Sequence, residues 1–193
     1  CQVFCCKYHT PIVGGVTGTN NGGSDSEEEI EILETEIPLG AVPCLYDESC
    51  PLYPFADLDV KGWYHDFLHV CLEKGIMYGI STDRFGPDLT LTRAMVCQVL
   101  YSMAGKPAVT CENPFTDVPA DAWYTDAVLW AYETGLVSGY GNGILAPNDA
   151  VTREQLALIL FRHSGEEAGA EISLLPFGDG DSISSWAKGA MAW

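Results

Sequence analysis

The sequence is poor in basic residues. Lys and Arg together number 9, against 27 for Asp and Glu, and the formal net charge at pH 7 is −18. Such a chain cannot neutralise a long run of phosphates, which argues against nucleic acid or an anionic membrane surface as the main partner. We therefore expect a partner that is recognised locally rather than through a broad basic surface.

Long hydrophobic runs are also absent. The longest apolar stretch extends from Leu156 to Phe161, far short of the roughly 20 residues that a membrane-spanning helix needs. Hydrophobic residues nevertheless make up 47% of the 193 residues, and aromatic residues 11%. This content is too high for a wholly disordered chain and is sufficient for a sizeable core. We predict a folded, acidic protein without membrane insertion.

Recognisable catalytic motifs are missing as well. The sequence has no nucleophile elbow, no Gly-Lys-Ser/Thr phosphate loop and no His-Glu-x-x-His pair. Its carboxylates are too numerous to nominate an acid–base pair. We predict that this chain is not an enzyme and needs no cofactor, so that any catalytic domain would be a separate passenger.

The first 54 residues differ in composition from the rest. The chain opens with Cys1 rather than Met and shows no signal-peptide pattern, so we expect either a removed leader or a fragment. Residues 1–13 form a Cys-containing segment of unknown fold. Residues 14–54 are predicted to be a flexible acidic linker, because a Gly-, Asn- and Ser-rich stretch is followed by nine acids without Lys or Arg. An edge strand is the alternative for its alternating Ile and Glu residues.

An internal repeat occupies the remainder of the chain. Residues 55–106 recur as 115–166 at a constant offset of 60, and the identities in this register include Trp, Gly and Pro residues. A third copy begins at Phe177, reaches Trp186 and ends within its first helix. We call residues 55–110 repeat one, 111–172 repeat two and 173–193 repeat three. Ten of these identities, given by their residues in repeat one, are Phe55, Asp57, Trp63, Tyr64, Asp66, Gly75, Gly79, Pro87, Thr92 and Arg93.

Each complete repeat has the pattern helix, loop, helix. In repeat two the first helix has apolar residues at helical spacing and is ended by Gly135. A glycine-rich loop follows, and the second helix begins at Thr152, which forms a Thr-x-x-Gln capping box with Gln155. Thr92 begins the corresponding helix of repeat one, but Met95 stands where repeat two has Gln155 and cannot return a side-chain hydrogen bond. We therefore expect this helix start to be less stable. The fold class predicted is all-α.

The motifs of the repeat resemble the S-layer homology family. The similarity is most specific in Phe115-Thr-Asp-Val-Pro, Gly135-Leu-Val-Ser-Gly and Val151-Thr-Arg-Glu-Gln. It implies a pseudo-threefold helical bundle, here with an incomplete third repeat. It also implies non-covalent anchoring of a secreted protein to a secondary cell-wall polysaccharide, often through a pyruvate-ketal sugar. The implied location is extracellular, at the cell wall or S-layer of a Gram-positive-type bacterium.

Candidate ligand-binding residues follow from the resemblance and from elementary chemistry. Arg93 and Arg153 each occupy a first helical position, where free backbone N–H groups and the helix dipole favour a carboxylate that a guanidinium can also bind. A Trp supplies an apolar face for a sugar ring. The resemblance places the ligand in grooves between adjacent repeats. The candidates are Arg93, Arg153, Trp63, Trp123, Trp186, Asp57, Asp117 and Asp179.

Each candidate has a structural alternative. The three Trp residues would serve equally well as core residues, and Trp130 and Trp193 are predicted to belong to the core. For the three Asp residues we favour a role in capping or orienting the start of the helix that follows. For the two Arg residues the alternative is a structural ion pair.

Metal ligation is not expected. His65 and His69 have the i, i+4 spacing of paired metal ligands, but repeat two carries Thr125 and Leu129 at those positions, which excludes a site common to the repeats. The Asp-containing run 178–182 lacks the later acidic ligand of a complete calcium loop.

The pairing of the eight cysteines cannot be deduced from the sequence. Two of them, Cys44 and Cys50, are close enough to form a short disulfide loop. A zinc cluster at the N-terminal end has only weak support, because two of its cysteines are adjacent. Its ligands would be Cys1, Cys5, Cys6 and His9.

Two other functions remain open from the sequence. The repeats could form a structural or protein-interaction element without affinity for glycans. Alternatively, the chain is an anchor fragment of an extracellular enzyme whose catalytic domain is missing. We also expect oligomerisation through the incomplete third repeat, because an uncovered apolar face favours association.

Overall fold

The computed structural model describes residues 44–166 and 178–193. Within these ranges the regular secondary structure is helical; two isolated β-bridges occur, but no strand. The all-α prediction is thus confirmed for the described part of the chain. The predictions for residues 1–43, the Cys-containing segment and most of the acidic linker, lie outside the described residues.

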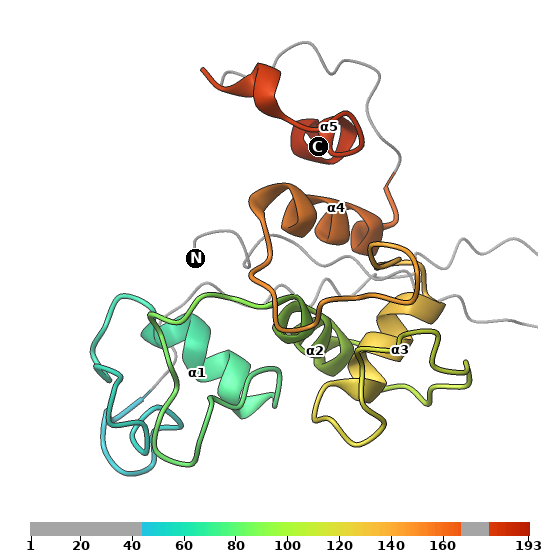
Figure 1. The fold of residues 1–193 in the computed structure, drawn as a ribbon. Coiled ribbons are helices and arrows are strands. Elements are labelled where there is room, and N and C mark those ends of the chain that lie inside the picture. Colours follow the sequence, from blue (N-terminus) through green and yellow to red (C-terminus); the bar gives the residue numbers. More distant parts are fainter. Residues whose placement is uncertain (1–43, 167–177) are drawn as a thin grey trace, which may run out of the picture. The chain divides into compact units, whose positions relative to one another are not determined.

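The helices follow the predicted order of helix, loop, helix (Figure 1). None of the helices in the described ranges combines the length and apolar character needed to cross a membrane. Repeat one contains α1 (His65–Glu73) and α2 (Arg93–Met103), repeat two contains α3 (Thr125–Glu133) and α4 (Arg153–Ser164), and repeat three contains the 3₁₀-helix η2 (Gly180–Ser182) and α5 (Lys188–Ala192).

The second helix of each complete repeat begins at a threonine cap. At α4 the Thr152 hydroxyl accepts a hydrogen bond from the Gln155 N–H at 3.2 Å, and the Gln155 side-chain oxygen accepts one from the Thr152 N–H at 3.2 Å. The predicted capping box is therefore confirmed. At α2 the Thr92 hydroxyl accepts only from the Met95 N–H, at 3.3 Å. This helix start has one capping bond fewer, as predicted.

The glycines that follow the first helices have the left-handed backbone conformation expected of helix stops. Gly75 has φ of 62° and Gly135 has φ of 77°. In the loop of repeat two, Gly139 has φ of 70°, and a Cβ placed there would lie 2.5 Å from the Ile144 carbonyl oxygen. Only glycine satisfies both conditions at this position.

Helix packing occurs between successive repeats. Helix α2 packs against α3, and α4 packs against α5 (Figure 1). The main core lies between α2, α3, α4 and the loop of repeat two. Its most deeply buried residues are Ala94, Val96, Cys97, Leu100, Ala127, Val128, Ala131 and Leu145.

Two tryptophans predicted to be core residues have different surroundings. Trp130 is buried, with 8% of its surface exposed, as predicted. Trp193 is 52% exposed, so the prediction was wrong for this residue. Its ring contacts Phe161 of α4, at 5.8 Å between centroids, and this one-sided contact leaves much of the indole open to solvent.

Residues 44–54 differ from the predicted linker. Cys50 and Leu52 are buried and form a small cluster with Leu68 of α1. The Cys50 N–H donates to the Asp47 carbonyl oxygen at 2.9 Å, which closes a turn. The physical reason is that Cys50 and Leu52 are apolar side chains that pack against α1. The packed structure therefore begins before Phe55.

Candidate functional site

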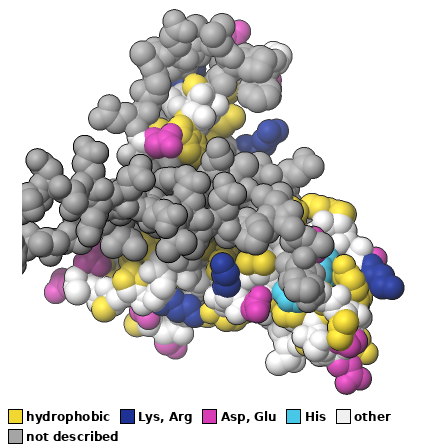
Figure 2. Space-filling model, turned by 180° about the vertical axis from the view of Figure 1, so that it is seen from behind, with side chains coloured by type: hydrophobic (Ala, Val, Ile, Leu, Met, Phe, Trp, Pro, Cys, Tyr) yellow, Lys and Arg dark blue, Asp and Glu magenta, His cyan; other side chains and the backbone are white. Residues whose placement is uncertain are grey.

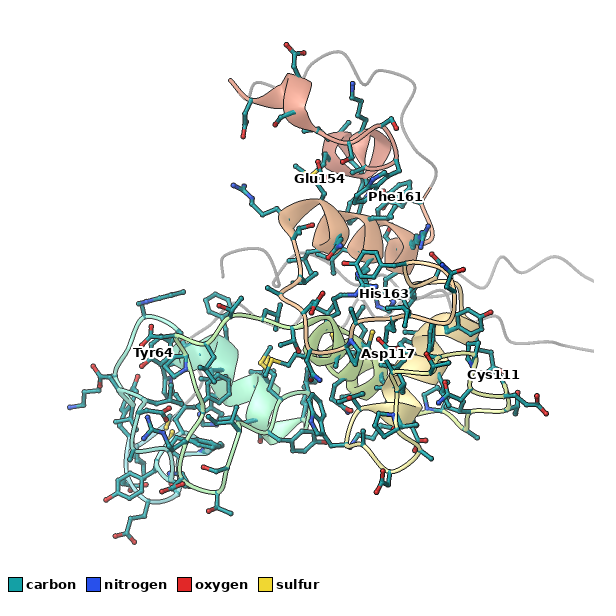
Figure 3. All side chains as sticks on the ribbon, viewed as in Figure 1. Tyr64, Cys111, Asp117, Glu154, Phe161 and His163 are labelled. Carbon is teal, nitrogen blue, oxygen red and sulfur yellow. The ribbon has the colours of Figure 1, made fainter. Side chains whose placement is uncertain are left out.

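Two of the predicted aspartates hold loops. The carboxylate of Asp117 accepts hydrogen bonds from the backbone N–H groups of Leu145, at 3.0 Å, and Ala146, at 2.7 Å (Figure 3). Asp57 accepts in the same way from two consecutive N–H groups of the loop in repeat one, both at 2.8 Å. Neither carboxylate caps the helix that follows it, so the prediction of capping was wrong for these two residues. Each instead fixes the turn between the two helices of its own repeat.

These hydrogen bonds favour the ionised form of both aspartates. The Phe85 N–H has the largest effect on Asp57 and, with further help from Gly86 and Arg84, it lowers the pKa against the opposing effect of burial. For Asp117 burial alone would raise the pKa. The N–H groups of Leu145 and Ala146 and the more distant Arg93 charge outweigh burial, so the pKa lies below its usual value.

Asp179 in repeat three has a different environment. It is exposed and precedes η2, and its side chain makes no capping hydrogen bond. Its backbone carbonyl oxygen accepts from the Ser182 hydroxyl at 2.7 Å. The three aspartates therefore do not have one common role in the described residues.

Arg93 is enclosed by the following repeat. Its side chain is buried, its Nε donates to the Leu145 carbonyl oxygen at 2.9 Å, and its guanidinium carbon lies 4.6 Å from the centre of the Tyr140 ring. The backbone N–H groups at the start of α2 are occupied as well. Those of Arg93 and Ala94 donate to carbonyl oxygens of residues 149 and 147, at 3.0 and 2.9 Å. This helix start is thus used to join repeat one to repeat two.

Arg153, the equivalent residue of α4, is exposed. Among the described residues, none accepts a hydrogen bond from the backbone N–H groups of Arg153 or Glu154. Among residues 44–166 and 178–193, the first backbone N–H groups of this 12-residue helix therefore have no acceptor, and they lie beside a guanidinium. The Glu154 carboxylate accepts from the Ser184 N–H at 2.7 Å, which brings this helix start close to repeat three (Figure 3).

The three candidate tryptophans are surface residues. The exposed fractions are 70% for Trp63, 61% for Trp123 and 51% for Trp186. Trp63 and Trp123 contact the tyrosine that follows each of them edge-on, with centroids 5.7 and 5.1 Å apart. The alternative that these rings belong to the core is excluded, and each offers apolar surface to solvent. By sequence, Trp186 lies two residues from Ser184 and thus near the start of α4.

An open hollow of about 530 Å³ lies beside Trp63. Sequence reasoning missed its cation, Lys61, because the repeat places Asp121 at the equivalent position and therefore gives no signal common to both copies. The hollow combines an indole, a lysine and a carboxylate. It is lined by Tyr46, Lys61, Gly62, Trp63, His65 and Asp66.

Sequence reasoning also missed a group of metal-ligating side chains. His65 and His69 have no histidine counterparts in repeat two, and the two cysteines precede the repeat, within the predicted linker. The structure brings the four side chains together, with no disulfide among the described cysteines. A Cys-x₅-Cys spacing ahead of the His-x₃-His spacing was the available signal. The group consists of Cys44, Cys50, His65 and His69.

Comparison with known proteins identifies two segments. A family model described as S-layer homology domain matches residues 54–94 and 114–157. These segments contain α1, α3 and the starts of α2 and α4, and they include Asp57, Asp117, Arg93 and Arg153.

The relatives have names of different kinds. An endoglucanase of Bacillus sp. (strain KSM-635) is 32% identical over 143 residues, which cover 72% of this chain. A surface-layer 125 kDa protein of Lysinibacillus sphaericus is 30% identical over 129 residues, 67% of this chain. An amylopullulanase of Thermoanaerobacterium thermosulfurigenes is 30% identical over 142 residues, 69% of this chain. The matches span 15%, 11% and 7% of these relatives, respectively.

Proposed function

The chain belongs to the S-layer homology domain family through residues 54–94 and 114–157, and from this membership we propose that it anchors a secreted bacterial protein to the cell wall. The domain is a binding module rather than a catalytic one. Surface proteins and enzymes with different names share it, and it makes up a small part of each relative. This distribution supports a portable anchor whose passenger varies.

The ligand we propose is a secondary cell-wall polysaccharide that carries a pyruvate-ketal sugar. The pyruvyl carboxylate would bind at the start of α4, where the Arg153 guanidinium and open backbone N–H groups meet. Trp186 offers an apolar face for the sugar ring from repeat three. The observation that carries this proposal is the contrast between the exposed Arg153 and the enclosed Arg93.

Trp63 and Trp123 are proposed as further sugar contacts. Both are more than half exposed, and the hollow beside Trp63 includes the cation Lys61. Asp57 and Asp117 take part indirectly, because they fix the loops that precede α2 and α4. Arg93 is assigned to the junction between repeats one and two rather than to the ligand.

The charge distribution favours recognition of one sugar over recognition of a polyanionic stripe. The net charge of −18 repels an anionic polymer at long range. On the face shown in Figure 2, the described Lys and Arg side chains are scattered and do not gather into a patch. A single carboxylate bound by Arg153 requires no such patch.

Three finer points belong to the same proposal. We propose that the repeats form a pseudo-threefold bundle, supported by the contacts of α2 with α3 and of α4 with α5. The location is the cell wall or S-layer of a Gram-positive-type bacterium. Self-association through residues 173–193 is supported by the exposed rings of Trp186 and Trp193.

Co-sedimentation with purified Gram-positive cell wall tests the proposed function. The chain should sediment with native wall and stay in the supernatant after chemical removal of the ketal pyruvate. Equal sedimentation with both walls would contradict the pyruvate-specific mechanism. Failure to sediment with either wall would favour the alternative of a repeat without glycan affinity.

A further inference from the structure

Four metal-ligating atoms converge beside the start of α1. The Sγ atoms of Cys44 and Cys50 and one ring nitrogen each of His65 and His69 lie within 4.8 Å of one another. Cys50 Sγ is 3.6 Å from His65 Nε2 and 3.9 Å from His69 Nδ1. Around a tetrahedral zinc ion, bond lengths of about 2.3 Å to sulfur and 2.0 Å to nitrogen place neighbouring ligand atoms about 3.3–3.8 Å apart. The observed spacing is close to that of the edges of such a tetrahedron.

The surroundings of these atoms also fit a metal site. Cys50, His65 and His69 are buried, and Cys44 is half-buried. The second nitrogen of His65, Nδ1, lies 2.8 Å from a carboxylate oxygen of Asp66, the arrangement that commonly orients a metal-bound histidine. The Tyr46 N–H donates to Cys44 Sγ at 3.3 Å, a contact that stabilises a thiolate.

From this convergence we propose that Cys44, Cys50, His65 and His69 bind one structural Zn²⁺ ion. Two thiolates and two imidazoles form a donor set that selects zinc, and with all four tetrahedral positions supplied by the protein the site is closed. Binding displaces the proton of each thiol. The two thiolate charges then balance the charge of the ion, so the buried site is neutral overall.

Zinc would stabilise the smaller of the two buried clusters. The buried cluster of repeat one consists of Cys50, Leu52 and Leu68, whereas the main core draws on three helices. Small cores of this kind are often supplemented by a metal. Bound zinc would connect the turn at residues 44–50 to α1 through the ligands from both segments.

Repeat two differs at both histidine positions. Thr125 and Leu129 occupy the positions that correspond to His65 and His69. Leu129 is buried, and the Thr125 hydroxyl donates to the Pro119 carbonyl oxygen at 2.6 Å. The proposed site is therefore particular to repeat one.

Zinc content of the full-length chain tests the proposal. The parent protein for the test carries Cys1→Ser, Cys5→Ser and Cys6→Ser, which removes the thiols of the first residues as an alternative site. Purified under reducing conditions, it should retain about one zinc per chain. Cys50→Ser and His69→Leu should each reduce the content more than tenfold, while Cys111→Ser, the control thiol outside the group, should retain it.

Two further measurements keep the result interpretable. X-ray absorption at the zinc edge should show a shell of two sulfur and two nitrogen atoms. A chelator should lower the melting temperature of the parent. It should leave that of His69→Leu unchanged, because this variant has no zinc to lose; leucine is chosen because repeat two has Leu129 at the equivalent position. The proposal is overturned if the parent retains no zinc, if Cys50→Ser and His69→Leu retain it, or if oxygen-free protein contains a Cys44–Cys50 disulfide.

Discussion

The Nε of Arg93 donates a hydrogen bond to the Leu145 carbonyl oxygen at 2.9 Å, and this bond joins the start of α2 to the loop of the next repeat. The same junction includes the two backbone N–H groups at the start of α2 and the Tyr140 ring. The residue that follows Thr in the repeat thus has two different environments. Arg93 is buried against the loop of repeat two, whereas Arg153 is exposed.

Replacing Arg93 should destabilise the protein. Arg93→Ala removes a buried charge-assisted hydrogen bond and leaves the Leu145 carbonyl oxygen without its donor, which should lower the free energy of unfolding by about 2 kcal/mol. Urea denaturation followed by circular dichroism measures the loss. The matched variant Arg153→Ala alters an exposed side chain and should change the stability by less than about 0.5 kcal/mol. Equal losses in the two variants would show that their environments do not differ as described.

The two loop-holding aspartates should make stability depend on pH under acidic conditions. Because their pKa values are lower in the folded protein than usual, their contribution is fully present above the usual carboxyl range. It should disappear as the pH falls below about 4 and passes through the lowered pKa values. Asp117→Asn should reduce stability at neutral pH and flatten this acid dependence.

Thermal melts between acidic and neutral pH provide the measurement. The control is Asp121→Asn, since Asp121 is exposed. A steep acid dependence that persists in Asp117→Asn would assign the effect to other carboxylates.

A methyl group at Gly139 should lower the free energy of unfolding far more than one at Gly135. Both glycines have positive φ, but a Cβ at Gly139 would meet Ile144 backbone oxygen at 2.5 Å, whereas none of the described atoms lies within 4 Å at Gly135. We expect Gly139→Ala to cost about 3 kcal/mol and Gly135→Ala about 1 kcal/mol. Denaturant titrations of both variants measure the difference. Similar costs would mean that the loop can move away from the added methyl group.

Binding to the polymer should tighten when moderate salt is added. The acidic chain repels an anionic polymer, and raising the ionic strength to about 0.15 M shortens the screening length to about 8 Å. The short-range contact with Arg153 is affected less. Affinity for purified wall polymer, measured across a salt series, should therefore rise before it levels off. A steady decline from the lowest salt would instead indicate binding through many separate cations.

The sequence was sufficient for features that repeat or that have local causes. The capping box at Thr152 and the glycine stops depend on short-range chemistry and were confirmed, as was the all-α class for residues 44–166 and 178–193. The roles of Asp57 and Asp117 were missed, because each carboxylate binds a loop 28 residues later in the chain. Sequence spacing alone could not show this contact.

The sequence did not predict the features that depend on contacts between residues far apart in the chain. Arg93 and Arg153 occupy identical positions in the repeat, yet only Arg93 is covered by the loop that follows. Cys44 and Cys50 lie outside the repeated register, so comparing the repeats could not connect them with His65 and His69. Features common to both repeats were predictable, and features particular to one repeat required the structure.

The affinity of the chain for a pyruvylated wall oligosaccharide, compared between the unaltered protein and Arg153→Ala by calorimetry, tests the account most directly. Loss of a charge-assisted hydrogen bond worth about 1.5–3 kcal/mol should weaken binding about 10- to 100-fold, with helix content unchanged. Arg153→Lys should weaken binding less than Arg153→Ala, since it keeps the charge but not the planar fork. Undiminished affinity in a folded Arg153→Ala protein would contradict the assignment of the ligand to the start of α4.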